Sequence, residues 1–140
     1  MNRDTLVQWL QTSCLLTGRF LLGLYFIVPG ISKITGYEGT AAYMAEHGVP
    51  MIPVLLPLTI VLQIGLGTAL IVGFYARSSA FLLAGLTLVI SIFMHNFWAM
   101  PEGIQQAHEM QNFIKNMAIM AGLLTIVGLG AGKYSLSSQT

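Results

Sequence analysis

The chain has 140 residues, of which 55% are hydrophobic and only 8% carry a charged side chain. Soluble domains contain roughly a quarter charged residues, so this composition indicates an integral membrane protein. The net charge of +1 lacks the basic excess of a nucleic-acid-binding surface, which excludes nucleic acid as a partner. Membrane crossings and their loops use up the whole length, so we expect a single domain over residues 1–140.

Four apolar segments follow one another along the chain. They run roughly from Cys14 to Ile31, Val54 to Phe74, Ser78 to Trp98 and Phe113 to Ala131. A helix needs ~20 residues to cross ~30 Å of hydrocarbon, and each segment is close to that length. The sequence therefore predicts an all-α, multi-pass four-helix bundle in a lipid bilayer. Small residues four apart, such as Gly65 and Ala69, predict close approach between these helices.

The connection between the first two segments predicts a short interfacial helix over Gly39–His47. Thr40 is expected to cap its start, and Gly48 fits a left-handed residue just past its end. Pro50 prevents the helix from continuing. The fourth long helix is expected to begin in the polar stretch before Phe113 and to protrude from the membrane.

The basic residues predict how the bundle is oriented. Four crossings place both termini on one side, together with Arg3, Arg77 and Lys133, whereas Lys33 and Lys115 lie near helix ends on the other side. Lys and Arg are retained in the cytoplasm during insertion. Both termini are therefore predicted to be cytoplasmic, and the short helix is predicted to lie in an outer loop.

Arg19 lies within the first apolar segment, toward its cytoplasmic end. A charge at the centre of the hydrocarbon costs about 2.5–3.5 kcal/mol on insertion scales, so we expect Arg19 to face inward and to be paired. Gln63, near the middle of the second segment, is the expected neighbour. Three roles remain open for Arg19: reaching to the inner interface, holding helices together through a hydrogen bond, or contacting a ligand.

A second group of polar residues lies toward the outer end. Lys33 closes the first segment, and His95 lies one turn inside the end of the third. From the polar stretch before the fourth segment into its start, a helical stripe is formed by Gln105, His108, Asn112 and Lys115, with Asn116 beside it. These side chains are predicted to converge in a polar pocket near the outer leaflet. The alternative is that the lysines only reach to headgroups and His95 only packs helices. The candidate ligand-binding residues are Arg19, Lys33, Gln63, His95, Asn112, Lys115 and Asn116.

The residue pattern disfavours a metal or haem cofactor. No metal-ligand spacing is visible, and no nucleophile accompanies a histidine and an acid. His47, His95 and His108 fall on three segments, and only His95 is expected within the hydrocarbon, whereas a haem held between helices needs two axial ligands.

In order and spacing, polar and small residues over about residues 15–131 resemble the DoxX family of small four-helix bacterial membrane proteins. In the first segment and its loop the matching residues are Arg19, Gly23, Phe26, Gly30, Lys33, Gly39, Thr40, Tyr43, Met44, Gly48 and Pro50. Further on they are Gly65, Gly73, Arg77, His95, Phe97, Trp98, Asn112, Phe113, Lys115 and Asn116. The resemblance implies a location in the bacterial inner membrane.

The family commonly has a Glu where this chain has Gln63, and a neutral amide cannot relay a proton or neutralise Arg19. Relatives include the small membrane subunit of thiosulfate:quinone oxidoreductase. The resemblance thus implies a non-catalytic, accessory subunit of a quinone-linked membrane redox assembly, in contact with partner proteins or with further copies of itself. With the polar pocket, it also implies a quinone or a lipid as the ligand between the helices. One alternative is a small solute carrier or channel. Another is an enzyme acting on a lipid-borne substrate through His95 or Lys115, which ranks last because no carboxylate is expected at membrane depth.

Overall fold

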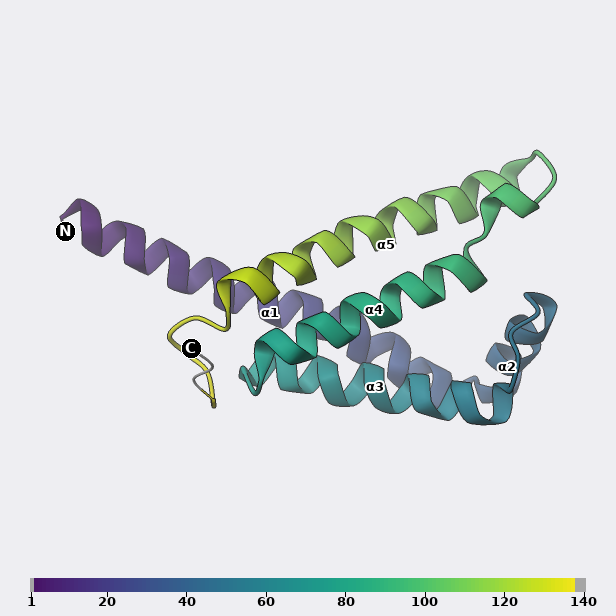
Figure 1. Ribbon diagram of the computed structural model, residues 1–140, viewed down its shortest axis with the longest axis horizontal. Helices are drawn as coiled ribbons and strands as arrows, with labels where there is room; N and C mark the ends of the chain where they lie inside the picture. The colour runs from purple at the N-terminus through teal and green to yellow at the C-terminus, as the bar shows by residue number, and fades with distance from the viewer. Residues whose placement is uncertain (1, 138–140) are drawn as a thin grey trace.

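A computed structural model describes residues 2–137, which form five α-helices and one 3-10 turn (Figure 1). In chain order the elements are α1 (Arg3–Thr35), α2 (Tyr37–Glu46), α3 (Ile52–Val72), α4 (Ala76–Met94), η1 (Phe97–Ala99) and α5 (Ile104–Leu129). Four segments are long and apolar enough to cross a membrane: α1, α3, α4 with η1, and α5. The predicted all-α fold with four membrane-length helices is confirmed.

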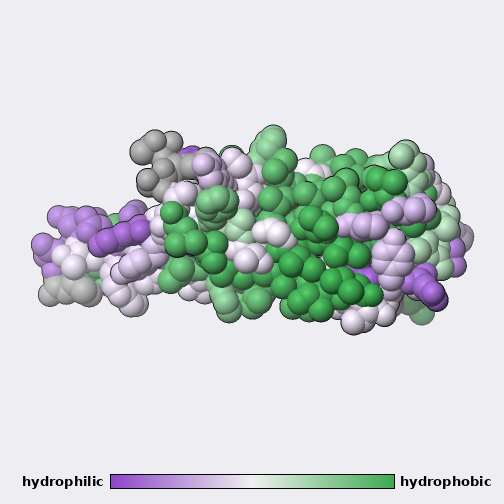
Figure 2. Space-filling model, turned by 90° about the horizontal axis from the view of Figure 1, so that it is seen from below, coloured by the Kyte–Doolittle hydropathy of each residue, from purple (hydrophilic) through white to green (hydrophobic). Residues whose placement is uncertain are grey.

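Both ends of the described chain lie at one end of the bundle, which we call the terminal end, and α2 lies at the other, the α2 end (Figure 1). Hydrophobic residues cover the middle of the face shown in Figure 2, and hydrophilic residues gather toward its two ends. This distribution is the one expected of helices that cross hydrocarbon and emerge into headgroups. The cytoplasmic position of the termini stays a prediction.

The short helix in the first loop is present, and its start differs from the predicted one. It begins at Tyr37, preceded by Gly36, so Thr40 lies inside it and is not its cap. The Thr40 hydroxyl donates to the Gly36 carbonyl oxygen at 3.0 Å, as hydroxyls within helices commonly do. At the other end, Gly48 has φ +67°, the left-handed conformation predicted for it.

Helix α1 packs closely on α3 through two glycines. A Cβ added to Gly67 would lie 2.9 Å from the Gly23 carbonyl oxygen, and one added to Gly23 would lie 2.6 Å from the Gly67 carbonyl oxygen. The predicted close approach at Gly65 is wrong, because nothing lies within 4 Å of a Cβ at that position. Backbones that approach this closely leave room for glycine alone.

Two substitutions on α3 test this packing. Gly67→Ala is expected to destabilise the protein by about 1–3 kcal/mol because the added methyl overlaps the α1 backbone. Gly65→Ala, one half-turn away in open space, is expected to be neutral or slightly stabilising, since alanine favours helix. Thermal unfolding in the same lipid nanodiscs measures both. Equal effects of the two substitutions would contradict the proposed contact.

The middle of the bundle is an apolar core. Fully or nearly fully buried side chains from all four long helices form it: Phe26, Leu70, Ala76, Ala80, Leu83, Ala84, Leu123 and Ile126. Arg19, in the terminal half of α1, is also buried. The polar side chains that line a cavity toward the α2 end lie beyond this core, so the core separates two groups of buried polar residues.

Candidate ligand cavity at the α2 end

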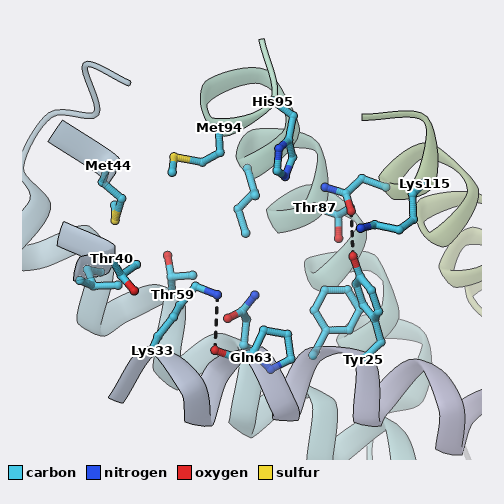
Figure 3. Close-up of a pocket in the computed structure, with 15 residues that line it drawn as sticks. Tyr25, Lys33, Thr40, Met44, Thr59, Gln63, Thr87, Met94, His95 and Lys115 are labelled. Carbon is cyan, nitrogen blue, oxygen red and sulfur yellow. Dashed lines mark hydrogen bonds between the residues drawn. The ribbon is translucent and has the colours of Figure 1, made fainter. Parts of the chain in front are cut away.

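A cavity of about 190 Å³ lies between α1, α2, α3, α4 and α5 toward the α2 end. Figure 3 shows polar side chains from several helices pointing into it. Of the predicted site residues, the structure brings five to its wall: Lys33, Gln63, His95, Lys115 and Asn116. Residues that the sequence analysis did not single out also line it, among them Tyr25, Thr40, Thr59 and Thr87.

Gln63 projects from α3 into this cavity (Figure 3). Its side chain is only 5% exposed, and its Oε1 atom has no hydrogen-bond partner among the described residues. A buried polar group without a partner costs roughly 1–3 kcal/mol, so native proteins usually satisfy such groups. The Gln63 amide is therefore an available contact for a ligand or for water.

Two lysines face the same cavity from opposite sides. Lys33 of α1 has its Nζ atom 3.4 Å from the Pro29 carbonyl oxygen in its own helix. Lys115 of α5 donates to Asn112 Oδ1 at 3.1 Å. Among residues 2–137, the structure forms no salt bridge between either lysine and a carboxylate. Both ammonium groups thus retain donor capacity and charge for another partner.

Glu109 on α5 joins three elements at the rim of the cavity, and sequence analysis missed it. The carboxylate is 5% exposed. Its Oε2 atom lies 2.7 Å from His95 Nδ1, Tyr43 of α2 donates to Oε1 at 3.1 Å, and Asn112 donates to Oε2 at 3.4 Å. The structure thus has a buried carboxylate near the start of α5, at a residue that the predicted site does not include.

The inward face of α5 differs from the predicted stripe. Gln105, His108 and Lys115 are exposed, whereas Glu109 and Asn116 are buried. The spacing of seven residues between Glu109 and Asn116 is also helical, and Asn112 lies between them on the same side. The predicted stripe passes through His108, one residue before Glu109, and therefore does not include it. His95 also differs: it follows Met94, the last residue of α4, instead of lying one turn inside the helix.

Deeper in the cavity, Asn116 forms a hydrogen-bonded wall. Tyr25 donates from its hydroxyl to Asn116 Oδ1 at 2.9 Å, and Asn116 Nδ2 donates to Ser91 Oγ at 3.1 Å. Ser91 in turn donates to the Thr87 carbonyl oxygen at 2.7 Å. These groups satisfy one another, so they fix α1, α4 and α5 together at this depth.

Tyr43 provides a pH-dependent link between α2 and α5. Burial raises the pKa of the Tyr43 phenol above its ordinary value of 10.0, and the Glu109 carboxylate that accepts its hydrogen bond raises the pKa further. The folded protein therefore holds this proton at a pH where the unfolded chain has lost it. The contribution of Tyr43 to stability is complete below pH 10.0 and declines as the pH rises through the raised pKa.

We expect the free energy of unfolding to fall more steeply above pH 10.0 in the wild type than in Tyr43→Phe. Other tyrosines and lysines titrate in both proteins, so the difference between them isolates Tyr43. Tyr37→Phe, at an exposed position in the same helix, is the matched control and should keep the wild-type slope. Parallel profiles for the wild type and Tyr43→Phe would show that the hydrogen bond to Glu109 is not formed.

Arg19 is remote from this cavity and contacts backbone only. Its guanidinium donates to the carbonyl oxygens of Leu70 at 3.0 Å, Ile71 at 2.7 Å and Tyr134 at 2.7 Å, and also to that of Ala131. Leu70 and Ile71 belong to the last turn of α3, where carbonyls lack the usual donor four residues further along; Leu70 also accepts from the Gly73 N–H at 3.3 Å. The structure does not form the expected pairing with Gln63. Of the three roles open for Arg19, the contacts correspond to the structural one.

Arg77 of α4 binds the end of α5 in the way that Arg19 of α1 binds the end of α3. From the start of α4 its Nη1 donates to the carbonyl oxygens of Val127 at 2.6 Å and Gly128 at 2.9 Å, in the last turn of α5. Arginine at a helix C-terminus satisfies free carbonyls and complements the helix dipole. Arg19 and Arg77 thus hold helix ends at the terminal end, whereas Lys33 and Lys115 line the cavity at the α2 end.

Fold and cavity together define a small multi-pass membrane protein with a cavity between helices at one end, into which several polar side chains project. The family model described as DoxX matches residues 14–96, and this chain belongs to the DoxX family of integral inner-membrane proteins. It is 40% identical over 121 residues to the inner membrane protein YqjF of Escherichia coli (strain K12), which covers 86% of this chain and 87% of that protein.

The chain is also 33% identical over 125 residues to the inner membrane protein YphA of the same organism, covering 89% of each. No solved structure matches the chain. The predicted family is confirmed, and so is placement of the chain as a multi-pass protein of the inner membrane.

Proposed function

We propose that this protein is an accessory, non-catalytic subunit of a quinone-linked membrane redox assembly, and that it holds a quinone or a lipid in the cavity at the α2 end. The observation that carries the proposal is the unpartnered amide of Gln63 facing a cavity that Lys33 and Lys115 also line. The two ammonium groups and Gln63 Nε2 can donate to the carbonyl oxygens of a quinone or to the head group of a lipid, and Gln63 Oε1 can accept from a hydroxyl. In this proposal the α2 end lies at the outer leaflet, as the distribution of basic residues predicts.

Support for an accessory role comes from the family, because relatives in the DoxX family include the small membrane subunit of thiosulfate:quinone oxidoreductase. The outward-facing helix surfaces supply contact area for partners, with Phe20, Leu21, Val61, Phe81 and Leu82 among the large exposed apolar side chains. These residues contact lipid or protein equally well, so composition alone does not select between a partner subunit and a second copy.

The test is gentle extraction of the tagged protein from its own membrane, followed by native mass spectrometry and solvent extraction of bound lipids. We expect a copurifying membrane protein and a quinone or lipid bound near one per chain. Gln63→Leu should lower ligand occupancy, whereas Val61→Leu, on the exposed face of the same helix, should not. Recovery of this chain alone, with neither protein nor ligand bound, would contradict the proposal.

The pair of His95 and Glu109 favours a second candidate, an enzyme acting on a lipid-borne substrate. The two side chains lie 2.7 Å apart, and His95 also lines the cavity, so a base and its orienting carboxylate reach the same space. Turnover of a lipid substrate that is lost in His95→Ala while folding persists would favour the enzyme. If the wild type turns over no lipid substrate and His95→Ala lowers thermal stability, the pair of His95 and Glu109 has a structural role.

The structure offers less support to a carrier or channel. The apolar core lies between the Arg19 contacts and the cavity, whereas a transport path needs polar groups along its length. Accumulation of a solute by proteoliposomes containing the protein is the measurement that would favour transport.

A further inference from the structure

The charges around the cavity are unbalanced. Four ionisable groups face it or its rim: Lys33 from α1, Lys115 and Glu109 from α5, and His95 at the end of α4. Glu109 is engaged by His95 at 2.7 Å and reaches Lys115 only through the Asn112 amide. The two lysines therefore lack a carboxylate of their own among the described residues. An unpaired ammonium away from water is costly, so a bound anion would favour the half-buried Lys33, and the exposed Lys115 supplies a second positive charge beside it.

The size of the cavity limits the bound group. Its volume of about 190 Å³ corresponds to roughly six water molecules at ~30 Å³ each. A carboxylate or a phosphate monoester fits this space between Lys33 and Lys115, with Gln63 Nε2 as a further donor. A large glycosylated head group does not.

An apolar groove leads away from the cavity between α3 and α4. Its walls are aliphatic and aromatic side chains from both helices: Leu55, Leu58, Leu62, Leu86, Val89 and Phe93. Thr59, Ile90, Met44 and Met94 line both the groove and the cavity, so the two spaces are adjacent. In Figure 1, α3 and α4 leave their shared turn together and separate toward the α2 end. We call this space the α3–α4 groove.

A second recess between α1, α2 and α4 also adjoins the cavity. It shares Lys33, Thr40 and His95 with the cavity and adds Ser32 and Tyr43, among apolar side chains such as Val28 and Pro29. Of the residues that line the α3–α4 groove, by contrast, Thr59 alone is polar. A lysine-bearing cavity beside an apolar groove matches a molecule with a charged head and a hydrocarbon chain.

We propose that the cavity binds the anionic head of a single-chain amphiphile between Lys33 and Lys115, and that the acyl chain of this ligand lies in the α3–α4 groove. The inference rests on the proposed function and specifies its ligand: a carboxylate or phosphate head at the α2 end, with the chain directed toward lipid. A neutral quinone ring would leave both ammonium charges unbalanced.

The experiment is a native mass spectrometry titration of the purified full chain with four probes. Oleic acid and oleoyl lysophosphatidic acid carry anionic heads of the two kinds, monooleoylglycerol has the same chain with a neutral head, and decyl-ubiquinone represents a quinone. We expect one anionic probe or both to bind at least about tenfold more tightly than the neutral ones, a difference typical of one charge-assisted contact. Comparison of oleic acid with lysophosphatidic acid identifies the head group.

Charge variants test the lysines. Lys33→Gln with Lys115→Gln should abolish the preference for anionic probes, while Lys133→Gln, an exposed lysine at the terminal end, should retain it. Gln63→Glu should also abolish the preference, because it adds a carboxylate to the cavity without removing a lysine. Preserved thermal unfolding in these variants separates loss of binding from loss of fold.

Bulky variants test the groove. Val89→Trp fills the α3–α4 groove and should weaken binding of the oleoyl probes, whereas Val61→Trp, at an exposed position of α3 that does not line the groove, should not. Equal binding of neutral and anionic probes, or a preference that survives loss of both lysines, would overturn the inference and leave the proposed function standing. If none of the four probes binds and no ligand copurifies, both this inference and the proposed ligand-binding function are contradicted.

Discussion

Arg19→Leu is expected to be the most destabilising single substitution at the terminal end of the bundle, at about 3–5 kcal/mol. The Arg19 side chain is 1% exposed, and its guanidinium donates to carbonyls of Leu70, Ile71, Ala131 and Tyr134. A leucine removes all of these hydrogen bonds, although the Leu70 oxygen keeps the one from the Gly73 N–H. Carbonyls that lose their donor inside the protein are costly. Arg19→Lys should recover part of the loss, because an ammonium is a point charge that cannot serve both helix ends at once.

Thermal unfolding in nanodiscs measures the effect, with two arginines as comparisons. Arg77→Leu removes donors from two carbonyls and should cost less. Arg3→Leu, at an exposed position in the first turn of α1, should change stability by no more than ~0.5 kcal/mol. Unchanged unfolding of Arg19→Leu together with loss of a bound ligand would assign Arg19 to the ligand instead.

The fold followed from the sequence because hydropathy and length alone predict a membrane-spanning helix. Gly48 and the start of α5 in the polar stretch were predictable for equally local reasons, since a left-handed residue and a helix period each have a sequence signature. Five of the seven proposed site residues line the cavity for the same reason: polar residues within apolar helices turn inward.

What could not be predicted depends on contacts between distant segments. The first turns of α5 are polar on every side, so periodicity did not distinguish the stripe through His108 from the face through Glu109. Only contact with Tyr43 and His95 selects that face. The partners of Arg19 are backbone carbonyls, which every residue carries, so no sequence pattern marks them. Gly65 and Gly67 are likewise indistinguishable until the α1 backbone is placed.

Glu109→Leu is expected to have a comparable effect at the α2 end, again about 3–5 kcal/mol, because it removes the acceptor shared by Tyr43, His95 and Asn112. The hydrogen bond from Tyr43 ties α2 to α5, so its loss should loosen α2 specifically. Amide hydrogen exchange in α2 should rise, while exchange in the middle of α1 and α3, which pack through Gly23 and Gly67, should change little.

A double-mutant cycle separates this connection from general damage. Glu109→Gln keeps the volume and an acceptor for Tyr43 but loses the charge opposite His95, so its cost should be smaller. Combining Glu109→Leu with Tyr43→Phe should be less destabilising than the sum of the two, with a coupling energy of about 0.5–3 kcal/mol. Glu102→Leu, an exposed carboxylate in the preceding loop, is the control and should leave α2 protected. Strict additivity, or wild-type exchange in α2 of Glu109→Leu, would mean that α2 is held by its contacts with α1 and α3 alone.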